Sequence, residues 1–219
     1  MASPTHQEPR VTRRPYAPRL PPAERREQLI DAALGLIIDQ GYAGVSIEAV
    51  ARVAGVTRPV VYDHFPNLGR LLAALVEREE KYAVAQLEMI VPESPGDQTP
   101  ADLLATAVQQ FLEAVASRPD TWKIILLPID GTPAIIREQV ERQRARMQER
   151  ITALVAWANG LPDFPEGLDV ELTGQAIRQL AEEAGRMVLT DPERYSPERY
   201  GQFVRAVVAL VWPHDGGDH

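Results

Sequence analysis

The 219-residue sequence has no cysteine, only four histidines and few aromatic side chains. The lack of cysteine excludes disulfides, thiolate metal ligands and cysteine nucleophiles. No run approaches the ~20 apolar residues that a membrane span needs, and residues 1–22 lack the apolar core of a signal peptide. The sequence therefore predicts a cytoplasmic protein without a membrane partner.

Groups for catalysis are also scarce. The histidines are His6, His64, His214 and His219, and none lies at a motif spacing from a serine or a carboxylate. The sequence has no phosphate-binding glycine loop and no zinc-ligand pattern. We therefore predict a protein that is not an enzyme and that holds neither a metal nor another cofactor.

The net charge of −8 is unevenly distributed. Residues 1–70 contain nine arginines and seven acidic residues, whereas residues 71–219 contain 14 basic and 24 acidic residues. Six of the arginines lie within residues 1–26, and prolines exclude regular structure in residues 1–22. A basic end on an acidic body predicts local contact with a polyanion. An arginine-rich tail without a partner is the alternative.

Apolar residues recur at helical spacing along the chain, and no segment shows sustained period-two alternation, so the predicted fold class is all-α. Ser46, Thr57 and Asn67 are placed to cap helices, and Gly41 to end one. The expected helices cover residues 23–40, 46–54, 57–65, 67–90, 101–117, 121–128, 133–158, 168–190 and 196–212.

The segment GVTRPVVYDHF, residues 55–65, is polar and aromatic and directly follows an apolar segment. With residues 46–54 it predicts two short helices joined by a glycine-containing turn, which is helix-turn-helix geometry. Val56 and Val61 are expected to fill the space between the helices, which leaves the polar side chains of the second helix exposed. Those side-chain types suit the bases and phosphates of a DNA major groove. A helix-turn-helix that never contacts DNA is the alternative.

The run SIEAVARVAGVTRPVVYDHFPNLGRLLAALV, with the preceding amphipathic helix, resembles the DNA-binding domain of TetR-family repressors over residues 24–76. The family usually has a phosphate-binding lysine shortly after the recognition helix, whereas this chain has Leu68 and Gly69 there, followed by Arg70. The arginine-rich arm is similar to extensions that some members send into the minor groove. The predicted DNA contacts are Ser46, Thr57, Arg58, Val60, Tyr62, His64 and Arg70, with Arg13, Arg14 and Arg19 from the arm.

The resemblance further implies a C-terminal half that binds a small molecule and forms a homodimer. We expect a flexible arm at 1–22, a three-helix DNA-binding domain at 23–66, a larger antiparallel helical ligand-binding and dimerisation domain at 67–213, and a disordered tail at 214–219. The predicted pocket residues are Phe111, Trp122, Leu126, Met147, Ile151 and Trp157. The predicted dimer contacts are Ala176, Leu180, Ala184, Met187, Phe203, Val207 and Val211. For both sets, ordinary core packing is the alternative.

The predicted function is a ligand-responsive transcriptional regulator, a repressor that binds a palindromic operator as a homodimer and is released by a small hydrophobic ligand. Helix 67–90 is expected to couple the two halves, because it starts beside the recognition helix and ends near the pocket. The alternative is a helical ligand-binding or protein-interaction module that keeps this fold without regulating DNA.

Overall fold

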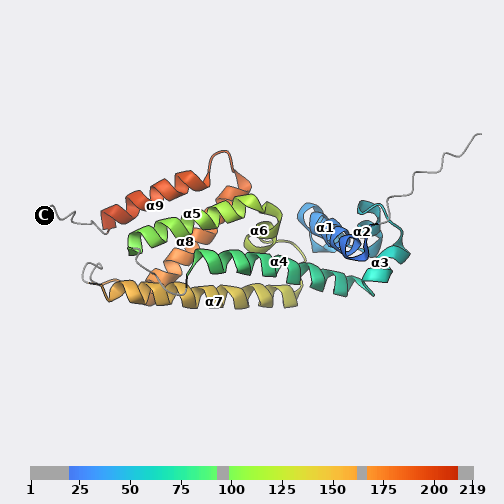
Figure 1. Cartoon of the computed structure of the whole chain (residues 1–219), viewed down its shortest axis with the longest axis horizontal. Coiled ribbons are helices and arrows are strands. Elements are labelled where there is room, and N and C mark those ends of the chain that lie inside the picture. Colours follow the sequence, from blue (N-terminus) through green and yellow to red (C-terminus); the bar gives the residue numbers. More distant parts are fainter. Residues whose placement is uncertain (1–19, 93–98, 162–166, 212–219) are drawn as a thin grey trace, which may run out of the picture.

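The computed structural model describes residues 20–92, 99–161 and 167–211. Over these ranges the chain forms nine α-helices and one short 3-10 helix, and it has no strand (Figure 1). The elements are α1 (Pro22–Gln40), η1 (Tyr42–Gly44), α2 (Ile47–Val53), α3 (Arg58–His64), α4 (Leu68–Ile90), α5 (Pro100–Ser117), α6 (Pro119–Leu126), α7 (Ala134–Asn159), α8 (Val170–Thr190) and α9 (Pro197–Val211).

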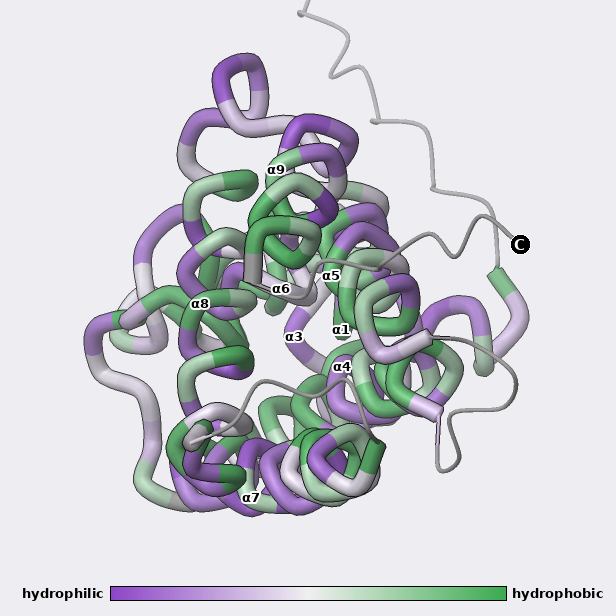
Figure 2. Tube along the Cα trace, turned by 90° about the vertical axis from the view of Figure 1, so that its left-hand side faces the viewer, coloured by the Kyte–Doolittle hydropathy of each residue, from purple (hydrophilic) through white to green (hydrophobic). Residues whose placement is uncertain are grey.

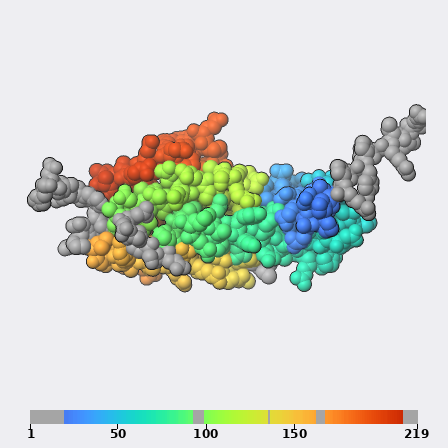
Figure 3. Space-filling model, in the orientation of Figure 1, coloured from blue at the N-terminus to red at the C-terminus, as the bar shows by residue number. Residues whose placement is uncertain are grey.

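The molecule is elongated, with α1–α3 at one end and α9 along one edge (Figure 3). We call residues 22–76 the head and residues 77–211 the body. The head core is formed by side chains from every helix of the head, and Leu29, Val50, Val61 and Leu71 are all 0% exposed. Burying each such side chain contributes roughly 1.5–3 kcal/mol. Tertiary packing therefore stabilises α2 and α3, which are too short to be stable alone.

Helix α4 belongs to both halves of the molecule. Its N-terminal part places Leu71 and Leu75 in the head core, and its C-terminal part places Ala83 and Ile90 in the body core. The helix begins at a cap in which Asn67 Oδ1 accepts a hydrogen bond from the backbone N–H of Arg70, at 2.9 Å. A 23-residue helix spans roughly 35 Å, so α4 is a continuous rod between the two cores.

The connection between α6 and α7 contacts the head at a second place. The backbone N–H of Tyr42 donates to the carbonyl of Asp130 at 3.2 Å, and Ile136 at the start of α7 joins the head core. The Tyr42 hydroxyl is buried without a hydrogen-bond partner, and burial raises the pKa of Tyr42 to about 12. The head is therefore packed against the body through α6 and α7 as well as joined to it by α4.

In the body, α5 packs against α8 and α9, and α7 packs against α8. Figure 2 shows apolar and polar positions alternating around these helices, as amphipathic helices require. At Gly185 an added Cβ would lie 2.8 Å from Leu126 Cδ1, so a larger residue there would require the Leu126 side chain to move. The absence of a side chain at Gly185 therefore leaves room for Leu126 between α6 and α8.

The predicted all-α class is confirmed, and every predicted helix is present with ends within two residues of the expected ones. One detail is wrong. Thr57 occupies the N-cap position of α3 but makes no side-chain capping bond. Pro59 has no N–H to donate, and the N–H of Val60 donates instead to the Thr57 carbonyl at 3.1 Å. No helix in the described part of the chain is long and apolar enough to cross a membrane.

We predict that Gly55→Ala lowers the free energy of unfolding by about 1 kcal/mol, because Gly55 has φ +67° and a Cβ is strained in the left-handed region. Gly35→Ala in α1 is the matched control, since its added Cβ meets no heavy atom within 4 Å and alanine favours helix by about 1 kcal/mol. Urea unfolding of both variants at one protein concentration should show shifts of opposite sign. Shifts of the same sign would contradict the turn's role.

Candidate DNA-binding surface and ligand cavity

Helices α2 and α3 are joined by a turn at Gly55, where the N–H of Val56 donates to the carbonyl of Ala51 at 2.9 Å. Helix α2 is capped by Ser46, whose Oγ accepts from the N–H of Ala49 at 3.1 Å. Helix α3 buries Val61 on the side that faces the head core. Its opposite side consequently faces solvent.

The exposed side of α3 gathers the side chains predicted to contact DNA. Thr57, Arg58 and Tyr62 are exposed, Tyr62 at 50%, while Val60 and His64 are half-buried. The Thr57 hydroxyl makes no cap, so it is available to a ligand. An exposed tyrosine and arginine on a short helix with one buried face suit a recognition helix that enters a major groove.

Arg58 forms an ion pair with Glu48. Its Nη1 lies 2.6 Å from Oε1 of Glu48 on α2, and both side chains are 59% exposed. An exposed pair of this kind contributes at most about 1 kcal/mol. A guanine or phosphate can therefore replace Glu48 as the partner of Arg58 at small cost.

Of the remaining predicted DNA contacts, Arg70 lies within the described residues and the three arginines of the arm lie outside them. Arg70 is exposed in the first turn of α4, close in sequence to the end of α3. Arg13, Arg14 and Arg19 lie outside the described residues. Within the described head, the predicted contacts come from three adjoining helices. Ser46 caps α2, Arg58 and Tyr62 lie on α3, and Arg70 lies on α4.

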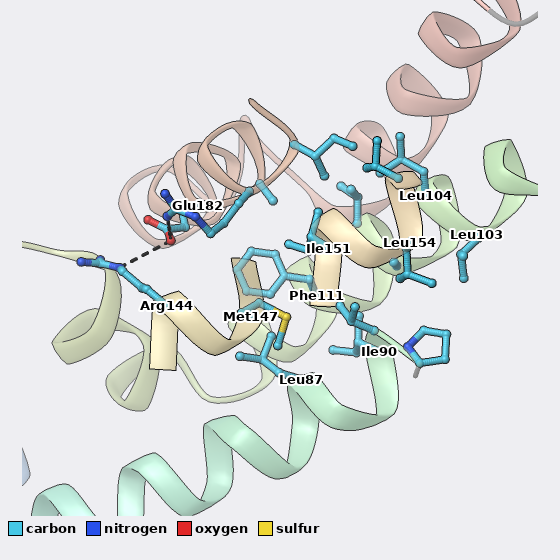
Figure 4. A pocket seen from close by; sticks show the side chains of 18 of the residues that line it. Leu87, Ile90, Leu103, Leu104, Phe111, Arg144, Met147, Ile151, Leu154 and Glu182 are labelled. Atoms are coloured by element: carbon cyan, nitrogen blue, oxygen red, sulfur yellow. Dashed lines mark hydrogen bonds and ion pairs between the residues drawn. The ribbon is translucent and has the colours of Figure 1, made fainter. Parts of the chain in front are cut away.

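The body contains a cavity of about 420 Å³ between α4, α5, α6, α7, α8 and α9. Its wall is almost entirely apolar, and Figure 4 shows side chains from several helices converging on it. Along α4 the lining runs from Val76 to Val91, roughly 22 Å of helix. All six residues predicted to line a pocket are in the wall, namely Phe111, Trp122, Leu126, Met147, Ile151 and Trp157.

The cavity wall also holds a few charged groups that periodicity did not reveal. Glu80 on α4 accepts hydrogen bonds from the amides of Gln139 and Gln143 on α7. At another part of the wall, Glu182 Oε1 lies 2.6 Å from Arg178 Nη1 and 3.4 Å from Arg144 Nε (Figure 4). Glu80 lies on α4 and Glu182 on α8, and charged residues on otherwise apolar faces leave no periodic pattern in the sequence.

A charged network lies where the head meets the body. Arg78 Nη1 donates to Glu27 at 2.9 Å and to Asp31 at 2.7 Å, both on α1, and Arg78 Nε donates to Glu79 at 2.7 Å. Glu79 is 1% exposed and accepts a second bond from the Thr121 hydroxyl of α6 at 2.5 Å. Burial lowers the pKa of Arg78, but the hydrogen bonds to Glu27, Asp31 and Glu79 outweigh it and raise the pKa above its usual range.

Helices α8 and α9 expose apolar side chains. Leu180 is 70% exposed, Phe203 60% and Val207 38%, and Ala176 is exposed as well. Two other residues predicted at a dimer interface are placed differently: Ala184 lies in the body core, 6% exposed, and Met187 is half-buried and accepts from the Tyr200 hydroxyl. The side chain of Val211 lies outside the described residues. Leu172 and Leu210 are also exposed apolar side chains of these helices, and neither is among the predicted dimer contacts.

No group of histidine, cysteine or acidic side chains in the described ranges could hold a metal ion. An exposed polar helix in a helix-turn-helix, joined by one long helix to a second helical unit, is the arrangement of a DNA-binding transcriptional regulator. Residues 29–75 match the model of the bacterial regulatory proteins of the tetR family. The chain is 30% identical to the HTH-type transcriptional regulator CymR of Pseudomonas putida over 199 residues, 83% of this chain and 94% of that protein. The chain belongs to the TetR family.

Other relatives agree with this assignment. The HTH-type transcriptional activator FasR of Mycolicibacterium smegmatis is 26% identical over 143 residues, which are 65% of this chain and 64% of that protein. This is a family of transcriptional regulators and not of enzymes, as the sequence analysis predicted. The alternative of a module without a role in transcription is therefore set aside.

Solved structures share the fold. A TetR-like regulator from Rhodococcus sp. RHA1 has a TM-score of 0.70 at 24% identity and covers 89% of this chain and 97% of its own. FadR of Bacillus subtilis, solved with stearoyl-CoA, has a TM-score of 0.63 at 20% identity over 84% and 98% of the two chains. SmeT, solved with triclosan, has a TM-score of 0.65 at 24% identity over 88% and 93%.

We predict that Arg58→Ala and Tyr62→Ala each weaken binding to the DNA that flanks this protein's own coding region by about tenfold or more, because each loss of a base or phosphate contact costs ~1–3 kcal/mol. Arg142→Ala is the matched control, since this arginine is exposed on α7 of the body. Fluorescence anisotropy across a salt series measures the affinity. A double variant that binds as tightly as wild type would contradict the assignment of α3.

Proposed function

We propose that this chain is a homodimeric repressor that binds a palindromic operator through α3 and is released when a hydrophobic effector enters the body cavity. The supporting observation is that α4 lines the cavity over its C-terminal half and packs into the head core over its N-terminal half. We further propose the division into a DNA-binding unit at 23–66 and an effector-binding and dimerisation unit at 67–213.

A hydrophobic effector is supported by the apolar wall of the cavity, into which a polar molecule would lose its hydration without compensation. Structures that share the fold have been solved with stearoyl-CoA and with triclosan, both of which carry large apolar parts. The elongated lining along α4 and α7 favours a ligand with an extended apolar portion.

A second copy of the chain is the occupant we propose for the exposed apolar residues of α8 and α9. On α8, Leu172, Ala176 and Leu180 recur every four residues, and on α9 Phe203, Val207 and Leu210 form a similar stripe. Two stripes from each of two chains can form a four-helix interface. A twofold dimer also matches a palindromic operator, whose half-sites lie ~34–36 Å apart or multiples of that.

The coupling mechanism follows from linkage. An effector changes operator affinity only by the difference in its affinity for the two arrangements of the heads. Trp122 lines the cavity, and the preceding residue, Thr121, holds the buried carboxylate of Glu79. A displacement of α6 by an effector is therefore transmitted through Glu79 and Arg78 to α1 of the head.

Leu75 in the head core and Leu87 in the cavity wall lie on the same helix, α4. Replacing either residue should alter the response to the effector without changing which operator is bound.

Repression is supported by the resemblance of the head to TetR-family repressors, although FasR is named an activator. A reporter gene placed behind the DNA that flanks this coding region tests whether the protein represses or activates transcription. Deletion of the regulator should raise transcription, and 1-decanol, a neutral hydrophobic probe, should raise it in the intact strain. Transcription that falls on deletion would identify an activator.

We predict that Leu180→Glu with Phe203→Glu yields a monomer with reduced operator affinity, because buried unpaired carboxylates are costly at an apolar interface. Met89→Glu is the matched control, since Met89 is 77% exposed on α4. Sedimentation velocity at micromolar concentration measures the mass. A double variant that sediments like wild type would place the dimer interface elsewhere.

We predict that Thr121→Val lowers the free energy of unfolding by about 1–3 kcal/mol, because it leaves an oxygen of a buried carboxylate without its donor. It should also reduce the effect of 1-decanol on operator affinity while leaving 1-decanol binding intact. Thr190→Val is the matched control, because its hydroxyl is exposed and bonds only to carbonyls of its own helix. An unchanged response of the operator complex would show that coupling does not pass through Glu79.

A further inference from the structure

Glu80 is the one acidic side chain of the cavity wall, within the described residues, that has no ion-pair partner. It is half-buried on α4, and its carboxylate accepts only from the amides of Gln139 and Gln143. No lysine or arginine of the described ranges lies within ion-pair distance of it. Amide donors alone therefore hold the Glu80 carboxylate, and it has no ion-pair partner in the wall.

The other charges of the wall are already matched. Glu182 pairs with Arg178 and Arg144, and Arg144 also pairs with Glu141. A ligand that brings an anion into the cavity would have to displace one of these pairs. A ligand that brings a cation finds Glu80 without a competitor.

The surroundings of Glu80 strengthen its attraction for a cation. The wall around it is apolar, and Coulomb interactions are several-fold stronger there than in water. Aromatic rings of Phe111 and Trp122 line the same cavity, and such rings attract cations at their faces. Residues 71–219 carry an excess of ten acidic residues, which favours the approach of cations over anions.

We propose that the effector is a lipophilic monocation, with an extended apolar portion in the cavity and one ammonium or amidinium group paired with Glu80. This inference rests on the proposed function of the cavity as the effector site. A cationic effector would differ in charge from stearoyl-CoA, the ligand in the FadR structure, which carries anionic phosphates.

The test compares three probes that share a ten-carbon chain and differ in the head group: decyltrimethylammonium, 1-decanol and decanoate. Binding is measured by tryptophan fluorescence, because Trp122 and Trp157 line the cavity. The two ionic probes are kept below their micelle concentrations and 1-decanol below its solubility limit. We expect decyltrimethylammonium to bind at least tenfold more tightly than 1-decanol, and decanoate to bind more weakly than 1-decanol.

The variant Glu80→Gln should abolish this order and leave the affinity for 1-decanol within about twofold of wild type. Glu77→Gln, on the exposed side of α4, is the matched control and should keep the order. If 1-decanol binds but the cation has no advantage in wild type, or keeps it in Glu80→Gln, the cationic class is wrong and the hydrophobic cavity stands. If none of the three probes binds, the effector site itself is wrong.

Discussion

A buried carboxylate determines how the two cores of this protein are joined. Glu79 is 1% exposed, and its oxygens are satisfied by Arg78 of α4 and Thr121 of α6. Because an unpaired charge in a protein interior is very costly, α4 and α6 must keep their register here. Arg78 also donates to Glu27 and Asp31 of α1, so the position of α1 relative to α4 is held in the same way. The orientation of the head is thereby tied to the position of α6.

The body cavity lies immediately beside this junction. Trp122 follows Thr121 in the chain and packs edge-to-face on Phe111, with ring centroids 5.2 Å apart. Helix α6 has eight residues and is the shortest helix of the body. In the proposed coupling, a displacement of α6 by an effector reaches α3 through α1 and α4 without any change in α3 itself.

Local patterns predicted the helices and the helix-turn-helix, because apolar spacing reports which face of a helix is buried. The same spacing does not separate the wall of a cavity from an ordinary core. Local patterns did not reveal the pairing of Arg78 with Glu27 and Asp31, which lie about 50 residues earlier in the chain. Likewise, Ala184 was expected at a dimer surface but lies in the body core, since spacing identifies an apolar face without saying what covers it. Charged groups on apolar faces, such as Glu80, carry no periodic signal at all.

The central claim is that filling the cavity changes the spacing of the two heads. Because the chain has no cysteine, a single spin label can be placed at Val53→Cys, which is 54% exposed at the end of α2. Pulsed electron paramagnetic resonance then gives the distance between labels in the proposed dimer, with and without 1-decanol at a concentration at which the change in tryptophan fluorescence is saturated. The account predicts a shift of several ångströms that Thr121→Val reduces. An unchanged distance in a filled cavity would contradict it.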